Sequence, residues 1–156
     1  MLQAPPLLLF FRAIPEGILG FYAIYVFSGE RINYKKLLLS GVLFGIITYL
    51  VRFLPIKFGV HTIISLIFFI FIAVQINRVH LIKAVTSCIL YIVILFVAEA
   101  VTYPLIASLV GVPLESLAQD PVKIVQYGSS SLIFTFIIIV IISIIKKKYN
   151  LRRKSE

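Results

Sequence analysis

The chain has 156 residues, of which 61% are hydrophobic and 13% charged, whereas a soluble domain is about 45–50% apolar and about 25% charged. With a mean hydropathy of +1.09, this composition excludes an ordinary soluble domain and points to a membrane protein. The single cysteine excludes an internal disulfide and a cysteine-cluster metal site, and we expect no metal and no cofactor. The net charge of +9 is expected to set membrane topology, not to bind nucleic acid.

Five segments are long and apolar enough to cross a bilayer, whose hydrocarbon core takes about 20 residues of helix. In chain order these predicted spans are 5–27, 37–54, 59–76, 84–110 and 122–145. The links between them are short, which favours antiparallel neighbours. We therefore predict an all-α integral membrane protein, with a compact bundle of five transmembrane helices in 1–145 and a basic tail in 146–156.

The distribution of lysine and arginine predicts the orientation, because loops rich in these residues face the cytoplasm. Six of the 11 residues in 146–156 are basic, which places the C-terminus inside and, after five spans, the N-terminus outside. This threading puts 11 basic residues on the inner side and 3 on the outer side. Residues 1–11 lack the basic start of a signal peptide, so we expect a retained first helix in a multi-pass protein of the cell (inner) membrane.

Ionisable residues inside the spans are few, and such residues usually face the bundle interior or a wet cavity. They are Arg12 and Glu16 in the first span, Arg52 in the second, His61 at the start of the third, and Glu99 in the fourth. Counted along the helices at about 1.5 Å per residue, all five fall in the outer half of the bilayer. The sequence therefore predicts a polar cluster at one depth.

Helical spacing supports this cluster. Arg12 and Glu16 are i,i+4 neighbours and lie on one helix face. One face of the second span carries small residues, which allow close helix packing, and one charged residue. This stripe consists of Gly41, Gly45, Thr48 and Arg52. A comparable stripe of the fourth span consists of Ala84, Cys88, Tyr91, Leu95 and Glu99. Pro15 and Pro104 fall near the same depth and free backbone carbonyls that need other partners.

Two interpretations of the cluster remain open at this point. In the functional one, an outward-opening pocket binds a small molecule or a peptide, or carries protons; its residues are Arg12, Glu16, Arg52, His61, Glu99 and Tyr103. In the structural one, Arg12 pairs with Glu16 and Arg52 pairs with Glu99, and the two pairs fix the order of the helices.

Three further patterns each allow two interpretations. His80 and Cys88 invite comparison with membrane cysteine peptidases, although the glycine-rich stretch around the histidine of such enzymes is absent and Cys88 fits a packing role. Gly41-x-x-x-Gly45 is a motif for close helix packing, either in a homodimer or within one chain. The basic tail attracts anionic membrane lipid or serves as a stop-transfer anchor.

Three stretches carry a resemblance to a known family: 12–16, 30–36 and 52–62. They resemble the membrane modules of Firmicute sensor histidine kinases of the GHKL type, the group that contains peptide-pheromone receptors, and short kinase-less membrane proteins of Firmicutes. The resemblance covers roughly residues 10–110 and implies a role in signalling. Because the sequence ends 11 residues after the last predicted span, we expect no kinase activity, and no binding residue of the family is transferred.

These observations favour a non-enzymatic membrane sensory or ligand-binding module. Its polar outer half would bind the signal, and its basic cytoplasmic end would meet membrane lipid, a second copy of the chain or another protein. The alternative is a small transporter, or the substrate-binding membrane subunit of one.

Overall fold

The computed structural model describes residues 9–51, 60–110 and 121–153. In these ranges the chain is helical apart from two short links, and no strand occurs there, which confirms the all-α prediction. In chain order the elements are η1 (Leu9–Ala13), a π-helical turn, α2 (Ile14–Ser28), α3 (Tyr34–Val51), α4 (Val60–Gln75), α5 (Leu81–Val110) and α7 (Pro121–Arg153).

Four of the helical segments are long and apolar enough to cross a membrane: Phe10–Ser28, Tyr34–Val51, Leu81–Leu109 and Ser129–Lys148. The remaining helix, α4, is apolar but has 16 residues. Helices apolar enough to span a membrane are therefore confirmed, while the multi-pass topology and the number of five spans stay predictions. With 30 and 33 residues, α5 and α7 are about 45 and 50 Å long, which exceeds a hydrocarbon core of about 30 Å.

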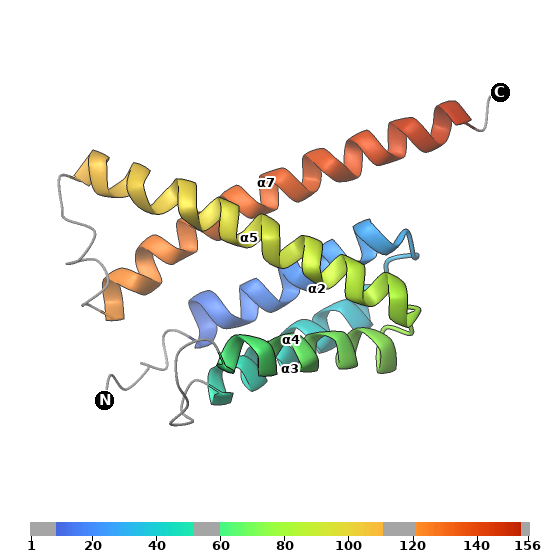
Figure 1. Cartoon of the computed structure of the whole chain (residues 1–156), viewed down its shortest axis with the longest axis horizontal. Coiled ribbons are helices and arrows are strands. Elements are labelled where there is room, and N and C mark those ends of the chain that lie inside the picture. Colours follow the sequence, from blue (N-terminus) through green and yellow to red (C-terminus); the bar gives the residue numbers. More distant parts are fainter. Residues whose placement is uncertain (1–8, 52–59, 111–120, 154–156) are drawn as a thin grey trace.

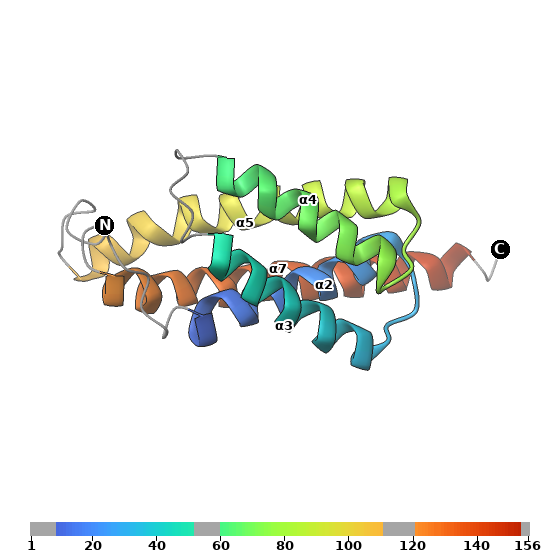
Figure 2. The same ribbon diagram turned by 90° about the horizontal axis from the view of Figure 1, so that it is seen from below.

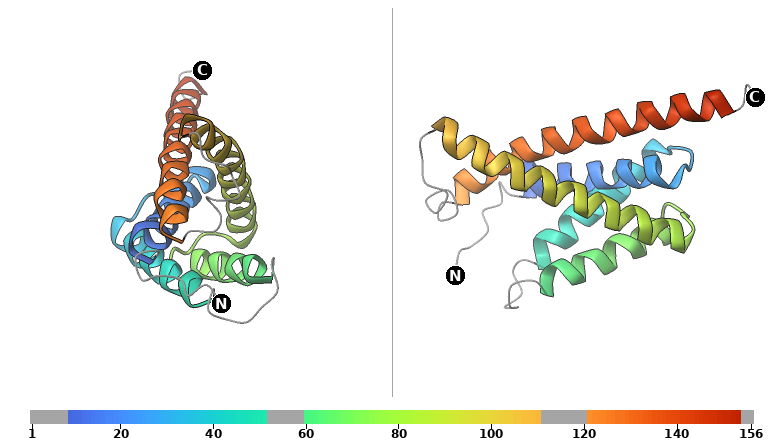
Figure 3. Two further views of the ribbon diagram at one scale, coloured as in Figure 1. Left: turned by 90° about the vertical axis from the view of Figure 1, so that its left-hand side faces the viewer. Right: turned by 45° about the horizontal axis from the view of Figure 1, so that its top comes forward.

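Helix α2 lies in the middle of the bundle, where it packs against α3, α5 and α7. Figure 1 shows α7 on one side of α2 and the α3–α4 pair on the other, and α5 contacts both α4 and α7. Successive helices run in opposite directions, as Figures 1 and 2 show, so η1 begins at one end of the bundle and α7 ends at the other. In Figure 3 the last turns of α7 extend beyond the other helices.

Glycines bring α2 and α3 into backbone contact. A Cβ atom added at Gly41 would lie 2.6 to 2.8 Å from side-chain and backbone atoms of Ile18, and one added at Gly45 would lie 2.9 Å from the Ala13 carbonyl oxygen. Gly17 of α2 faces the Gly41 carbonyl in the same way. Gly41-x-x-x-Gly45 therefore packs inside this chain, which decides between the two interpretations of that motif in favour of the intramolecular one.

The helix boundaries differ from the predicted ones at several places. Helix α3 starts at Tyr34, three residues before the predicted span. Helix α5 starts at Leu81, three residues before the predicted span, and α7 continues through the basic segment to Arg153. Lysine is a good helix former, and Lys146 Nζ donates hydrogen bonds of 2.9 and 3.0 Å to the carbonyls of Val26 and Phe27. This lysine satisfies the last carbonyls of α2, which have no partner within that helix.

Candidate functional site

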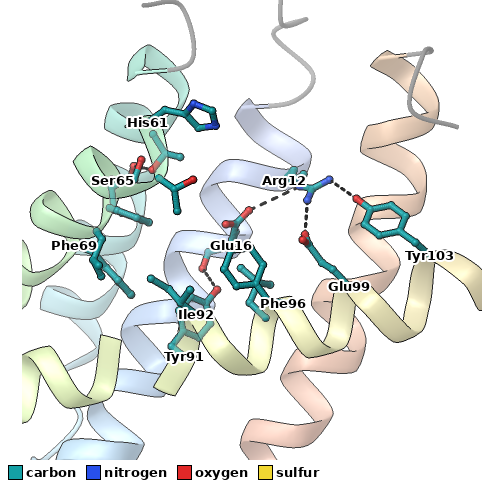
Figure 4. A pocket seen from close by; sticks show the side chains of 15 residues that line it. Arg12, Glu16, His61, Ser65, Phe69, Tyr91, Ile92, Phe96, Glu99 and Tyr103 are labelled. Carbon is teal, nitrogen blue, oxygen red and sulfur yellow. Dashed lines mark hydrogen bonds and ion pairs between the residues drawn. The ribbon is translucent and has the colours of Figure 1, made fainter. Parts of the chain in front are cut away.

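Arg12 is the centre of a charged cluster at the end of the bundle where α2 begins. Its Nη2 donates a 2.6 Å hydrogen bond to Glu99 Oε1, and its Nη1 donates one of 3.1 Å to the hydroxyl of Tyr103. Its Nε lies 3.8 Å from Glu16 Oε2. As Figure 4 shows, one buried guanidinium thus joins the start of α2 to two residues of α5.

The local backbone explains how Arg12 reaches this position. Pro15 has no N–H and cannot bond the carbonyl of Phe11, four residues earlier, and the chain passes through the π-helical turn η1 before α2 starts. Ser129 of α7 donates a hydrogen bond of 3.4 Å to that Phe11 carbonyl. The prediction that Pro15 frees a carbonyl for another partner is confirmed.

Polar side chains of other helices face this cluster across a cavity of about 510 Å³. His61, Thr62 and Ser65 come from the first turns of α4, and Thr48 comes from α3. In Figure 4 His61 and Ser65 lie on one side of the cavity, and Arg12 and the two α5 residues that it contacts lie on the other.

Aromatic and aliphatic side chains complete the cavity wall. They are Phe44, Leu66, Phe69, Tyr91, Ile92, Leu95 and Phe96. The rings of Phe44 and Phe69 stack with centroids 4.6 Å apart, and the Tyr91 ring lies 5.7 Å from that of Phe69. A volume of about 300–1,000 Å³, mainly apolar walls and a few convergent polar groups are the usual features of a small-molecule site.

The structure brings together five of the six residues predicted for the pocket, since Arg12, Glu16, His61, Glu99 and Tyr103 all line this cavity. Arg52, the sixth, lies outside the described residues. The pairing of Arg12 with Glu16 is present, and Arg12 also binds Glu99, whereas the predicted pairing of Arg52 with Glu99 lies outside the described residues. Helix α2 lies directly against α5, so Arg12 is close enough to bridge them.

No sequence pattern singled out the aromatic part of the wall. The chain contains 13 phenylalanines, and nothing in their spacing distinguishes Phe44, Phe69 and Phe96 from those that face lipid. Tyr91 was placed on the same stripe as Glu99, and its hydroxyl donates a 2.9 Å hydrogen bond to the Glu16 carbonyl.

A second polar cluster, at the other end of the bundle, was missed. Asn77 follows α4; its Oδ1 accepts a 2.8 Å hydrogen bond from the Tyr25 hydroxyl, and its Nδ2 donates one of 2.8 Å to Ser40 Oγ. All three side chains are buried. Because Asn77 falls in a predicted link between spans, where a polar residue is ordinarily solvated, its sequence position does not mark it as buried.

The pair considered for peptidase chemistry is separated. The Cys88 side chain is completely buried in the core, while His80 is exposed and immediately precedes α5. Eight residues of helix correspond to about 12 Å along the axis, whereas a nucleophile and its base need hydrogen-bond contact. Cys88 therefore occupies a packing position.

The described residues were also searched for metal ligands, and the chain was compared with known proteins. Among the described residues, no group of three or more histidine, cysteine, aspartate and glutamate side chains could hold a metal ion. Comparisons with protein-family models, with curated proteins and with solved structures returned no match to the chain.

Proposed function

We propose that this protein is a non-enzymatic sensory or ligand-binding module of the cell membrane that binds a small molecule in the cavity beside Arg12. The observation that carries this proposal is that the charged cluster borders a space of about 510 Å³. An ion cluster that only fixed the helix order needs no cavity beside it, whereas a small-molecule site combines a cavity with a few convergent polar groups. Ionisable groups that face a cavity within a membrane typically mark binding sites or ion pathways.

The positions of the charges support an outward-facing site. Arg12 lies in η1, directly before α2, and the last turn of α2 contacts Lys146, which is followed by the exposed Lys147 and Lys148. If the basic end faces the cytoplasm, as the distribution of lysine and arginine favours, the cavity lies in the outer half of the bilayer. A ligand from outside would then reach it without crossing the membrane.

The resemblance to membrane modules of sensor kinases agrees with this arrangement. In the proposed role, ligand binding between α2, α4 and α5 changes how these helices pack, and the basic end of the bundle passes the change to a cytoplasmic or membrane partner. The exposed lysines at the end of α7 also suit contact with anionic lipid.

A small transporter, or the substrate-binding membrane subunit of one, is the second candidate, because transport pathways also contain charged groups near the membrane centre. Transport requires the opposite end of the bundle to open. At that end the buried Tyr25–Asn77–Ser40 cluster joins three segments of the chain, so passage would require these hydrogen bonds to break. Uptake of labelled phenylbutylamine by proteoliposomes that contain the purified protein would support transport, and binding without uptake would support the module.

Thermal unfolding tests the binding site itself. We suggest three probes with the same apolar body and different heads: phenylbutylamine, phenylbutanol and phenylbutanoate. At about 100 times its Kd, a probe that binds should raise the Tm by at least about 5 °C.

Two matched variants locate the binding. Ser65→Phe fills the cavity and should abolish the shift, whereas Ser108→Phe makes the same change at an exposed position of α5 and should preserve it. If none of the three probes shifts the Tm of the unmodified protein, or if Ser65→Phe responds as Ser108→Phe does, the cavity is not a ligand site of this kind.

A further inference from the structure

We infer that the cavity selects a monovalent organic cation, a protonated amine or a quaternary ammonium group carried on an apolar body. This inference rests on the proposed function and specifies the ligand class of the same site.

The guanidinium of Arg12 is already engaged within the protein. Its three nitrogens face Glu16, Glu99 and Tyr103 at 3.8, 2.6 and 3.1 Å. An anionic ligand would have to displace a carboxylate from a short, charge-assisted hydrogen bond, which is among the stronger contacts in proteins. Arg12 therefore serves to position the two carboxylates, and it does not offer an anion site.

The carboxylates supply the negative charge that a cation needs. Glu16 and Glu99 both line the cavity, and their side chains keep 17% and 21% of their surface exposed. Glu99 uses Oε1 for Arg12, and within the described part of the chain no hydrogen bond is made to its Oε2.

The aromatic part of the cavity wall suits an organic cation better than a metal ion. The faces of aromatic rings attract cations, most of all alkylated ammonium groups, and Phe44, Phe69, Tyr91 and Phe96 all line the cavity. An inorganic cation would need a shell of oxygen ligands, and the described residues offer no cluster of three or more acidic, histidine or cysteine side chains. The space of about 510 Å³ accommodates an apolar body as well as the charged head.

The three phenylbutyl probes test this selectivity directly. Titration calorimetry with the full chain in nanodiscs of neutral phosphatidylcholine should give a Kd for phenylbutylamine at least ten times lower than that for phenylbutanol, and weaker binding still for phenylbutanoate. If the alcohol or the acid binds as tightly as the amine, the inference fails and the cavity remains a ligand site. If none binds, both the inference and the proposed function fail.

Substitutions of single residues test whether the charge of Glu99, and not the shape of its side chain, determines the affinity for phenylbutylamine. Glu99→Gln keeps the shape and removes the charge, and it should raise the Kd of phenylbutylamine about tenfold while leaving that of phenylbutanol unchanged. Glu30→Gln is the matched control, because Glu30 forms a 3.0 Å ion pair with Lys83 in an exposed position outside the cavity lining, and it should change neither Kd.

A second variant covers the case in which Glu99→Gln fails to fold. Phe96 lines the cavity but is 54% exposed, so Phe96→Leu should fold while it removes one aromatic face. The Kd of phenylbutylamine should rise several-fold and that of phenylbutanol should not. If the amine binds every folded variant as tightly as the unmodified protein, the carboxylate and the rings do not recognise a cation.

Discussion

The two ends of the bundle each bury a polar cluster that joins separate helices, and the cluster around Arg12 borders a cavity. Arg12 joins the start of α2 to α5, and Asn77 joins the end of α4 to α2 and α3. Along α2 the two clusters are separated by the 13 residues from Arg12 to Tyr25, or about 20 Å. The Asn77 cluster is neutral and enclosed, whereas the Arg12 cluster is charged and lies beside about 510 Å³ of space.

This difference distinguishes a structural polar cluster from a functional one. In the Asn77 cluster every side chain is buried and donates to or accepts from its neighbours, so it connects three segments of the chain. In the Arg12 cluster the arginine is buried, but the carboxylates are partly exposed to the cavity. The first arrangement stabilises the fold, and in the proposed function the second also presents charge to a ligand.

The largest expected effect comes from Arg12→Met. Removing one partner of a buried ion cluster leaves uncompensated charges, which typically costs about 3–5 kcal/mol. Because Glu16 and Glu99 remain 17% and 21% exposed, we expect about 3 kcal/mol, at the lower end of that range, measured as the free energy of unfolding in mixed micelles. Arg31→Met at an exposed position is the control and should change it by less than about 0.5 kcal/mol.

The stabilisation of Arg12→Met by a ligand provides a second measurement on the same variant. If the cavity selects organic cations, phenylbutylamine should stabilise Arg12→Met more than it stabilises the unmodified protein, because the amine takes the place of the lost guanidinium beside two carboxylates. Equal stabilisation of both proteins would contradict that expectation.

The next effect in size is expected from Asn77→Leu. The substitution leaves the Tyr25 hydroxyl without its acceptor and the Ser40 hydroxyl without its donor in a buried site, and an unsatisfied buried group costs about 1–3 kcal/mol. We expect a loss of about 2 kcal/mol, of which the triple variant with Tyr25→Phe and Ser40→Ala recovers most, because it removes the orphaned groups.

The affinity for phenylbutylamine should change in Asn77→Leu if ligand binding alters helix packing as far as the basic end, because coupling between two sites is reciprocal. An unchanged Kd would mean that binding in the cavity is not coupled to this end of the bundle, and it would contradict the proposed transmission of a signal.

The sequence allowed the Arg12 cluster to be predicted because the cost of placing a charge in a bilayer depends on depth. Arg12, Glu16 and Glu99 are rare charged residues in apolar segments. Because successive spans are antiparallel and each residue adds a fixed rise, counting along the helices places all three at a similar depth in the bilayer. The partners within the cluster could not be predicted in this way. They depend on which helices lie side by side, and α2 contacts α3, α5 and α7.

The Asn77 cluster and the aromatic wall could not be predicted for a different reason. A single asparagine between two spans carries no periodic signal, and only the packing of the end of α4 against Tyr25 and Ser40 shows that it is buried. Phenylalanine is equally suitable for lipid-facing and cavity-facing positions. Phe69 is 1% exposed and Phe71 is 58% exposed, although they are two residues apart in the same apolar helix.

The smallest expected effects come from one substitution made in both clusters, Tyr25→Phe and Tyr103→Phe. Tyr25 is 3% exposed, so its loss leaves Asn77 Oδ1 without a donor in an enclosed site and should cost about 1–2 kcal/mol. Tyr103 lies beside the cavity, where water can take over the hydrogen bond from Arg12, and the cost should be about 0.5 kcal/mol. Free energies of unfolding of the two variants, measured under the same conditions, test this order. Equal costs would mean that the cavity beside Arg12 is dry, and the distinction between an enclosed cluster and a ligand-accessible one would not hold.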